Sequence, residues 1–141
     1  NFAERTCMAS GSDPRARRTL DSAMEKPVTQ IRVVARLKIE DGKLENFKQV
    51  AQDCLACSRS KDRGTLQYDL YLSADESEAV LHELYVDSQA MIDHIDNLGE
   101  LIQALGDTVD ISVELYGEPT PALIEVLGGG GVPTYRFVGG L

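Results

Sequence analysis

Four segments of the chain alternate apolar and polar side chains, and two segments between them repeat apolar side chains every three to four residues. The alternating segments are residues 31–39, 65–72, 78–86 and 108–116. The helical repeats are residues 43–58 and 87–105, the second with a break expected near 97–99. A period of two predicts a strand with one buried face, and a spacing of three to four predicts an amphipathic helix. The order of these elements constrains the fold more than any other feature.

That order is strand, helix, strand, strand, helix, strand. It predicts an α+β fold of the ferredoxin-like split β-α-β-β-α-β type, in which an antiparallel sheet carries helices on one face. The opposite face holds apolar side chains as well, among them Val34, Val80, Leu84 and Val86. Leaving such a patch in water is unfavourable, so we predict a homodimer in which two sheets face each other.

The chain divides into three expected parts. Residues 1–27 form a leader that is a surface helix or disordered, residues 28–119 form the domain, and residues 120–141 form a C-terminal extension. In the extension, four consecutive glycines at 128–131 indicate a flexible hinge. Residues 134–138 have the β-branched and aromatic content of a strand. We expect this segment to contact the partner subunit, with a mobile terminus as the alternative.

The charge balance excludes some classes of partner. Fourteen Lys and Arg residues face twenty-three Asp and Glu residues, which gives a net charge of -9. Such a chain is poorly suited to bind nucleic acid or an anionic membrane surface. No apolar stretch approaches the roughly 18 residues of a membrane-spanning helix. Three cysteines, an odd number, suit a reducing compartment, so we expect a cytoplasmic protein.

Two of the cysteines have the spacing of redox and zinc motifs. Cys54 and Cys57 are separated by two residues, but they lie inside a predicted helix and away from its start. A helix start is where the dipole would lower a thiol pKa, and no second pair is present to complete a four-ligand zinc site. We therefore interpret both cysteines as helix packing and predict no metal site.

Five short stretches, taken together and in this order, resemble the antibiotic biosynthesis monooxygenase (ABM) domain family. They are residues 31–36 (IRVVAR), 41–43 (DGK), 64–70 (GTLQYDL), 81–85 (LHELY) and 90–94 (AMIDH). The resemblance spans about residues 30–117 and implies a dimeric α+β barrel. Several members oxidise polycyclic phenols or quinols with molecular oxygen and without bound metal or flavin.

The resemblance implies a monooxygenase that needs no cofactor and acts on a quinol-like or polyketide-like aromatic. Its partners would be a small aromatic molecule, molecular oxygen and a second copy of the chain. Relatives that degrade haem rely on a Trp in the pocket and an Asn in the first strand, and this chain has neither. The alternative is a non-catalytic dimeric module that binds a small hydrophobic ligand.

His94 is the first candidate catalytic residue. It falls within the apolar stripe of its predicted helix, together with Met91, and should point between the helix and the sheet. Imidazole titrates near pH ~6.5 when unperturbed, so it could take a proton from a phenol bound there. We expect Met91 to line the same pocket. The alternative is a buried histidine that only hydrogen-bonds Glu83 or a backbone carbonyl.

Glu83 is the second candidate catalytic residue. It shares a strand face with apolar neighbours, so its carboxylate needs a partner or a proton. It matches the Glu of the family's third strand, although a purely structural hydrogen bond is an equal alternative. Tyr68 and Tyr85 share faces with core leucines. Their rings are expected in the core, with hydroxyls free to bind substrate.

Overall fold

The computed structural model describes residues 29–141, and residues 29–137 belong to one compact unit. The prediction for the leader, residues 1–27, lies outside the described residues. The elements, in order, are β1 (Ile31–Ile39), α2 (Leu44–Lys61), β2 (Thr65–Leu72), β3 (Glu78–Tyr85), α3 (Ser88–Leu98), α4 (Glu100–Gly106), β4 (Val109–Tyr116), α5 (Pro121–Val126) and β5 (Thr134–Tyr135).

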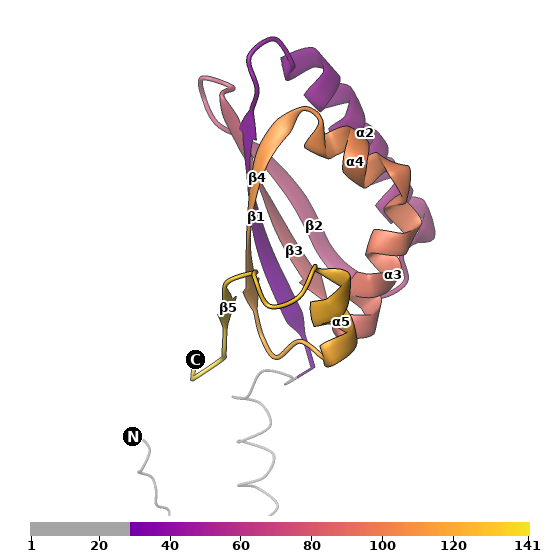
Figure 1. Ribbon diagram of the computed structural model, residues 1–141, viewed down its shortest axis with the longest axis vertical. Coiled ribbons are helices and arrows are strands. Elements are labelled where there is room, and N and C mark those ends of the chain that lie inside the picture. The colour runs from indigo at the N-terminus through magenta and orange to yellow at the C-terminus, as the bar shows by residue number, and fades with distance from the viewer. Residues whose placement is uncertain (1–28) are drawn as a thin grey trace, which may run out of the picture. The chain divides into compact units, whose positions relative to one another are not determined.

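The strands form one sheet in the order β2-β3-β1-β4-β5. The pairs β1–β3, β1–β4 and β2–β3 are antiparallel, and the short β5 runs parallel to β4. Helices α2, α3 and α4 cover one face of this sheet (Figure 1). The predicted α+β class and the split β-α-β-β-α-β order are therefore confirmed, with α5 and β5 added after the fourth strand. The dimer stays a prediction.

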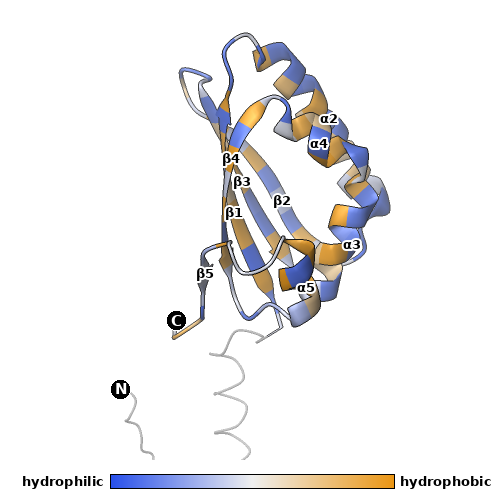
Figure 2. Cartoon of the chain, in the orientation of Figure 1, coloured by the Kyte–Doolittle hydropathy of each residue, from blue (hydrophilic) through white to orange (hydrophobic). Residues whose placement is uncertain are grey.

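Alternation along the strands is what separates the two faces of the sheet. In Figure 2, hydrophobic and hydrophilic residues succeed one another along β1 to β4. In β1, the residues Ile31, Val33, Ala35 and Leu37 are buried, and their neighbours Arg32, Arg36 and Lys38 are exposed. Because side chains alternate across a strand, the buried set faces the helices and the cationic set faces away from them.

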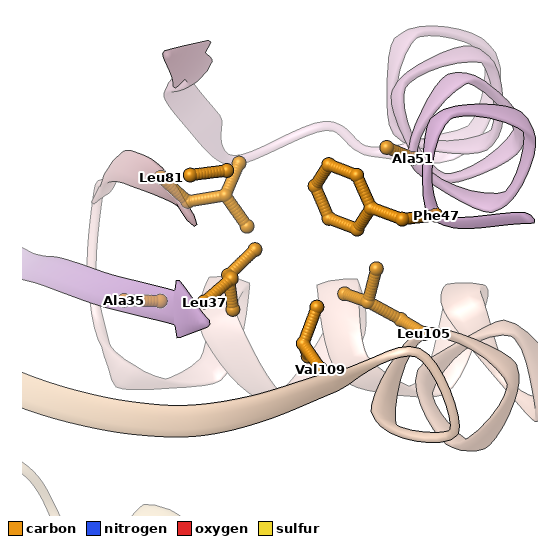
Figure 3. Packing of buried hydrophobic residues seen from close by; sticks show 8 residues of the cluster. Ala35, Leu37, Phe47, Ala51, Leu81, Leu105 and Val109 are labelled. Carbon is orange, nitrogen blue, oxygen red and sulfur yellow. The ribbon is translucent and has the colours of Figure 1, made fainter. Parts of the chain in front are cut away.

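Two clusters of buried side chains hold the helices on the sheet. The first joins α2 and α4 to the middle of the sheet, where Phe47, Leu37, Leu81 and Leu105 point toward one another (Figure 3). The second cluster joins α3 and α5 to the other end of the sheet. Its members are Ile31, Val33, Tyr85, Ala90, Met91, Leu115 and Leu123. The C-terminal extension therefore contributes Leu123, which is fully buried, to the core.

The ends of the helices follow local chemistry. The carboxylate of Asp87 accepts a hydrogen bond from the backbone N of Ala90 at 2.8 Å, which caps the start of α3. Gly99 has a φ of +54° and separates α3 from α4, so the expected break in this helical region is confirmed. Helix α2 extends three residues beyond the predicted end at 58 and stops at Lys61.

The C-terminal extension pairs with the sheet of its own chain. Residues Thr134 and Tyr135 pair with Leu115 and Tyr116, at the edge of the sheet formed by β4. The rings of Tyr116 and Tyr135 stack with their centroids 5.1 Å apart. Contact of this segment with a partner subunit stays a prediction.

Candidate active site

His94 lies in the middle of α3 with only 4% of its side chain exposed. Its ring is enclosed by two tyrosines. The ring of Tyr68 on β2 meets it edge-on with centroids 4.7 Å apart, and the ring of Tyr85 on β3 lies at 5.4 Å. The helical stripe thus directs His94 toward the sheet, and the strand alternation brings both tyrosines to the same place.

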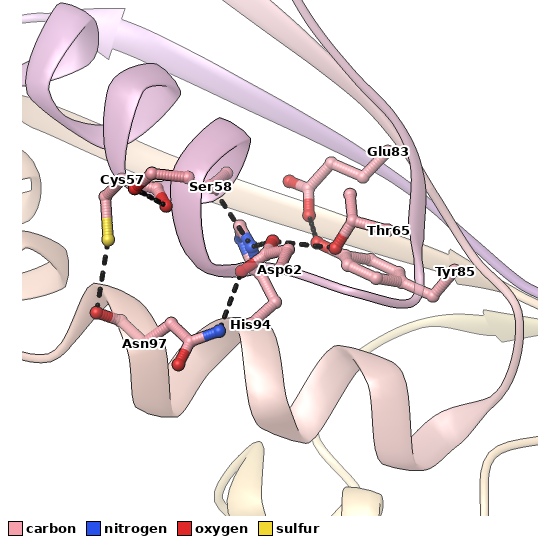
Figure 4. A network of polar contacts seen from close by, with 9 residues as sticks. Cys57, Ser58, Asp62, Thr65, Glu83, Tyr85, His94 and Asn97 are labelled. Carbon is pink, nitrogen blue, oxygen red and sulfur yellow. Dashed lines mark hydrogen bonds and ion pairs between the residues drawn. The ribbon is translucent and has the colours of Figure 1, made fainter.

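Asp62 binds the imidazole of His94. Its Oδ2 lies 2.7 Å from Nδ1 of His94, and its side chain is also only 4% exposed. Nδ2 of Asn97 donates to Oδ1 of Asp62 at 2.9 Å, and the hydroxyl of Thr65 donates to Oδ2 at 2.7 Å. These contacts form one network between the end of α2 and α3 (Figure 4). Burial alone would raise the pKa of Asp62, but the bonds from Asn97, Thr65 and His94 hold the pKa below its ordinary value.

The charge state of Asp62 fixes the tautomer of His94. A carboxylate with a lowered pKa is ionised at neutral pH and can only accept hydrogen bonds. Nδ1 of His94 must then carry the hydrogen, which leaves Nε2 as a proton acceptor in the neutral ring. The hydroxyl oxygen of Ser58 lies 3.3 Å from the same Nδ1. Asp62 would also stabilise the imidazolium that forms when Nε2 takes up a proton.

Glu83 and Tyr85 form a second buried pair beside His94. The hydroxyl of Tyr85 donates to Oε1 of Glu83, whose side chain is buried on the helix-facing side of β3. Burial raises the pKa of Glu83 to about 7, against a smaller lowering by the Tyr85 hydroxyl. Burial also raises the pKa of both Tyr68 and Tyr85, so these phenols stay protonated at neutral pH. The site therefore holds one ionised carboxylate and one carboxylate that titrates near neutrality.

Gly64 allows the loop that carries Asp62 to approach α3. A Cβ at Gly64 would lie 2.5 Å from Cβ of Ala90, which is closer than side chains can pack. The carbonyl of Gly64 also accepts a hydrogen bond from the backbone N of Val86 at 2.9 Å. A side chain here would push α3 away from the loop and lengthen the contact between Asp62 and His94.

The structure brings four of the five predicted site residues together. His94, Tyr68, Tyr85 and Glu83 are linked by ring contacts and a hydrogen bond. Met91 lies in the apolar cluster that also holds Tyr85, Ile31 and Leu115. The alternative for His94 was a hydrogen bond to Glu83 or to a backbone carbonyl. The partner found at Nδ1 of His94 is instead the carboxylate of Asp62.

Sequence reasoning missed Asp62, Ser58 and Asn97. Asp62 belongs to the polar run between the second helix and the second strand, which has the composition of a solvated loop. One signal was present in the sequence: Asn97 lies three residues after His94, on nearly the same side of its helix. A polar pair on an otherwise apolar stripe indicates a buried polar partner across the helix interface.

Two spaces adjoin the site. A void of about 10 Å³, room for one water molecule, lies between α2 and the sheet beside Tyr68. An open groove of about 310 Å³ lies between the C-terminal part of α2 and β2. Ser58, Asp62 and Tyr68, which all contact His94, are among the residues that line this groove.

The cysteines do not form a metal or disulfide site in the described part of the chain. Cys54 and Cys57 are free thiols, and burial raises the pKa of Cys54 to about 11. The thiol of Cys57 donates to the backbone carbonyl of Asn97 at 3.2 Å. Across residues 29–141, no group of three or more His, Cys, Asp or Glu side chains is placed to hold a metal ion. Within the same range, the helices are too short or too polar to cross a membrane.

The fold and the site together define a class of protein. Its members are split β-α-β-β-α-β domains with a buried histidine beside the sheet. Residues 30–98 match the sequence model of the family described as antibiotic biosynthesis monooxygenase. This match confirms the resemblance to the ABM family that the five sequence stretches predicted. No curated protein matches the chain.

Solved structures support the same fold. MupZ from Pseudomonas fluorescens superposes with a TM-score of 0.71 at 21% identity, covering 83% of this chain and 92% of that one. A "putative antibiotic biosynthesis monooxygenase" from Caulobacter crescentus CB15 gives a TM-score of 0.58 at 25% identity, covering 72% and 99%. Protein SO0527 from Shewanella oneidensis gives 0.57 at 26% identity, covering 65% and 93%. The family match and the Caulobacter structure support a monooxygenase at the level of the family.

Proposed function

We propose that this protein is a dimeric, cytoplasmic monooxygenase that oxidises a quinol-like or polyketide-like aromatic with molecular oxygen. The observation that carries the proposal is the buried pair of Asp62 and His94, held beside the rings of Tyr68 and Tyr85. A buried imidazole with its Nδ1 hydrogen bound to a carboxylate is a suitable general base for a phenol. The match of residues 30–98 to the ABM family model supports the reaction class.

The reaction begins with loss of a proton from the substrate. His94 accepts the phenolic proton at Nε2, and Asp62 stabilises the imidazolium that forms. The electron-rich phenolate then passes one electron to oxygen, and the two radicals combine at carbon. With an anthrone, the CH₂ group becomes a carbonyl, one oxygen atom enters the product and the other leaves as water. The substrate supplies all the electrons, so the proposal requires no metal or flavin.

The remaining residues orient the substrate. In the proposal, the hydroxyl of Tyr68 binds the aromatic ring system, and the pair of Glu83 and Tyr85 fixes the wall against which His94 packs. Glu83 can exchange a proton near neutral pH because burial raises its pKa to about 7. Met91 packs beside Tyr85 in the second core cluster and supports that wall from behind.

Oxygen uptake tests the proposal directly. The full chain is mixed with a panel of anthrones and hydroquinones, and the rate above spontaneous oxidation is measured with an oxygen electrode. Labelled ¹⁸O₂ should place one heavy atom in an anthraquinone product. His94→Gln should lower the rate by roughly 10²-fold, the smaller end of the range for a general base.

His82→Gln is the matched control. His82 is the other histidine of the chain and stands on the sheet face away from the helices, against the ring of Tyr71. This variant should keep the full rate. Quenching of ligand fluorescence without oxygen uptake for any compound would instead identify a binding module, the alternative function.

A further inference from the structure

The groove between α2 and β2 is separated from His94 by a single layer of side chains. Ser58, Asp62 and Tyr68 line the groove, and each of them also contacts the imidazole of His94. The void on the inner side of Tyr68 holds no more than a water molecule. Among the spaces next to the site, the groove is therefore the one with room for an aromatic ligand. Its volume of about 310 Å³ is at the lower end for small-molecule sites.

Strand β2 is irregular where it forms the wall of the groove. Its pairing with β3 shifts register between Thr65 and Gln67, so Leu66 is an extra residue in the strand. Leu66 is 55% exposed and lines the groove, as does Leu55 of α2. Bulges on edge strands are common next to active sites because they redirect a side chain. Here the bulge places an apolar side chain where it can cover one face of a flat ring.

One cation lines the groove, Arg59 in the last turn of α2. Two carboxylates line it as well: Asp62 binds His94, Asn97 and Thr65, and Asp69 accepts from Nε2 of Gln67 at 2.9 Å. Neither carboxylate is paired with Arg59, so its guanidinium can bind an anionic group of a ligand. A guanidinium at the end of a groove recognises a carboxylate or another planar anion.

We propose that this groove is the substrate site of the enzyme and selects a small hydroxylated aromatic that carries a carboxylate. The ring lies between Leu55 and Leu66, the carboxylate faces Arg59, and the phenol faces the layer over His94. The substrate class rests on the function proposed above, whereas the binding site does not depend on turnover. A small movement of the Tyr68 side chain would bring the phenol to His94.

A matched pair of ligands tests the proposal. We compare 1,4-dihydroxynaphthalene with its 2-carboxylate, which differ only in the anionic group. Binding is measured without oxygen by ligand fluorescence on the full chain, so no reaction is required. Arg59→Gln should weaken the carboxylate by about two- to fivefold, the range for an exposed ion pair, and leave the uncharged compound unchanged. Arg63→Gln, an exposed cation in the following loop, is the control and should alter neither.

A second variant probes the wall of the groove. Leu66→Glu should weaken both ligands, and the carboxylate more strongly, because it removes apolar contact and adds a like charge. Leu72→Glu, a partly exposed leucine at the other end of β2, should have no effect. If the wild type, Arg59→Gln and Leu66→Glu all bind each ligand with the same affinity, the proposed binding site is wrong, even if oxygen uptake is observed. Arg59-dependent binding without oxygen uptake would instead support the site and refute the monooxygenase.

Discussion

Oδ2 of Asp62, the C-cap residue that follows α2, lies 2.7 Å from Nδ1 of His94 in the middle of α3. The contact joins two helices that are far apart in sequence, and both side chains are removed from water. Its consequence is a single tautomer of His94 with a free Nε2. The catalytic proposal therefore depends on Asp62 as much as on His94.

Replacing Asp62 tests this dependence. Asp62→Asn should lower the rate of oxygen uptake by roughly tenfold to 10²-fold, because the amide no longer stabilises the imidazolium and allows the other tautomer. Nitrogen NMR of the histidine ring should show hydrogen on Nε2 as well as Nδ1. Asp93→Asn, which changes an exposed carboxylate of α3 that accepts from Nε2 of Gln89, is the control. A single unchanged tautomer in Asp62→Asn would contradict the role given to this carboxylate.

Glu83 should make the stability of the protein depend on pH in the direction opposite to a salt-bridged acid. Its pKa rises from 4.5 to about 7 in the folded chain. Between these values the folded state keeps a proton that the unfolded state has lost, so the free energy of unfolding falls as pH rises. The loss amounts to at most about 3 kcal/mol.

Glu83→Gln should remove this loss, because glutamine is never charged and can still accept the Tyr85 hydroxyl. In thermal melts the variant should equal the wild type near pH 4.5 and exceed it by several degrees at pH 8. Glu114→Gln changes the same kind of pair, with Tyr116, on the opposite face of the sheet. That control should show no such gain in melting temperature at pH 8. A wild-type melting curve independent of pH would refute the raised pKa.

Gly64 should be intolerant of any side chain. Gly64→Ala places a methyl group against Cβ of Ala90, a contact of 2.5 Å before relaxation, and should destabilise the fold by about 1–3 kcal/mol. The double variant with Ala90→Gly should recover part of this loss, because it relieves the contact but places a glycine inside α3 at a cost of about 1 kcal/mol. Gly106→Ala is the control, because its Cβ would meet nothing within 4 Å. Chemical denaturation measures all three, and a neutral Gly64→Ala would show that the loop does not need its close approach to α3.

The strands could be predicted from the sequence because one face of each is apolar, which gives a period of two. All four predicted strands have the observed limits to within one residue, and the first and second match them fully. The end of α2 could not be predicted as well, because Arg59 and Lys61 are good helix formers and residues 59–61 include no Gly or Pro to stop the helix. The helix ends only where Asp62 turns its side chain toward His94.

The site was predictable only in part, because periodicity reveals the direction of side chains on helices and strands but not in loops. His94, Tyr68, Tyr85 and Glu83 lie on elements whose periodicity reveals which way they point. Asp62 lies in an irregular loop, where no period constrains the direction of a side chain. Its position depends on how closely α2 and α3 approach, which is a property of tertiary packing and of Gly64. The pairing of β5 with β4 likewise depends on the open edge of β4, which cannot be predicted from the composition of either segment.

The sheet face away from the helices should form the dimer interface. Leu84 stands on this face, between Arg32 of β1 and Gln67 of β2. Leu84→Asp should raise the dimer dissociation constant at least tenfold, because a stable interface buries its apolar centre. Light scattering over a concentration series measures the change. Ile102→Asp alters an exposed apolar residue of α4 and should leave the dimer intact. A wild-type monomer at micromolar concentration would refute the interface.

The last segment of the chain should stabilise both the fold and the dimer. Truncation after Leu127 removes β5, and with it two backbone hydrogen bonds, from Leu115 N to Pro133 O at 2.9 Å and from Gly117 N to Tyr135 O at 2.8 Å. It also removes the stack of Tyr135 on Tyr116. Together these contacts are worth roughly 1.5–4.5 kcal/mol, so the melting temperature should fall by several degrees.

The dimer should weaken in the same truncation, because Tyr135 stacks on Tyr116, a residue of the sheet face that we expect to meet the partner. Truncation after Phe137 keeps β5 and should preserve both properties, which makes it the matched control. A lower melting temperature with an unchanged dimer would show that the extension serves only its own subunit. If neither quantity changes after truncation at Leu127, the extension contributes nothing to stability, and the exposed edge of β4 must be tolerated in water.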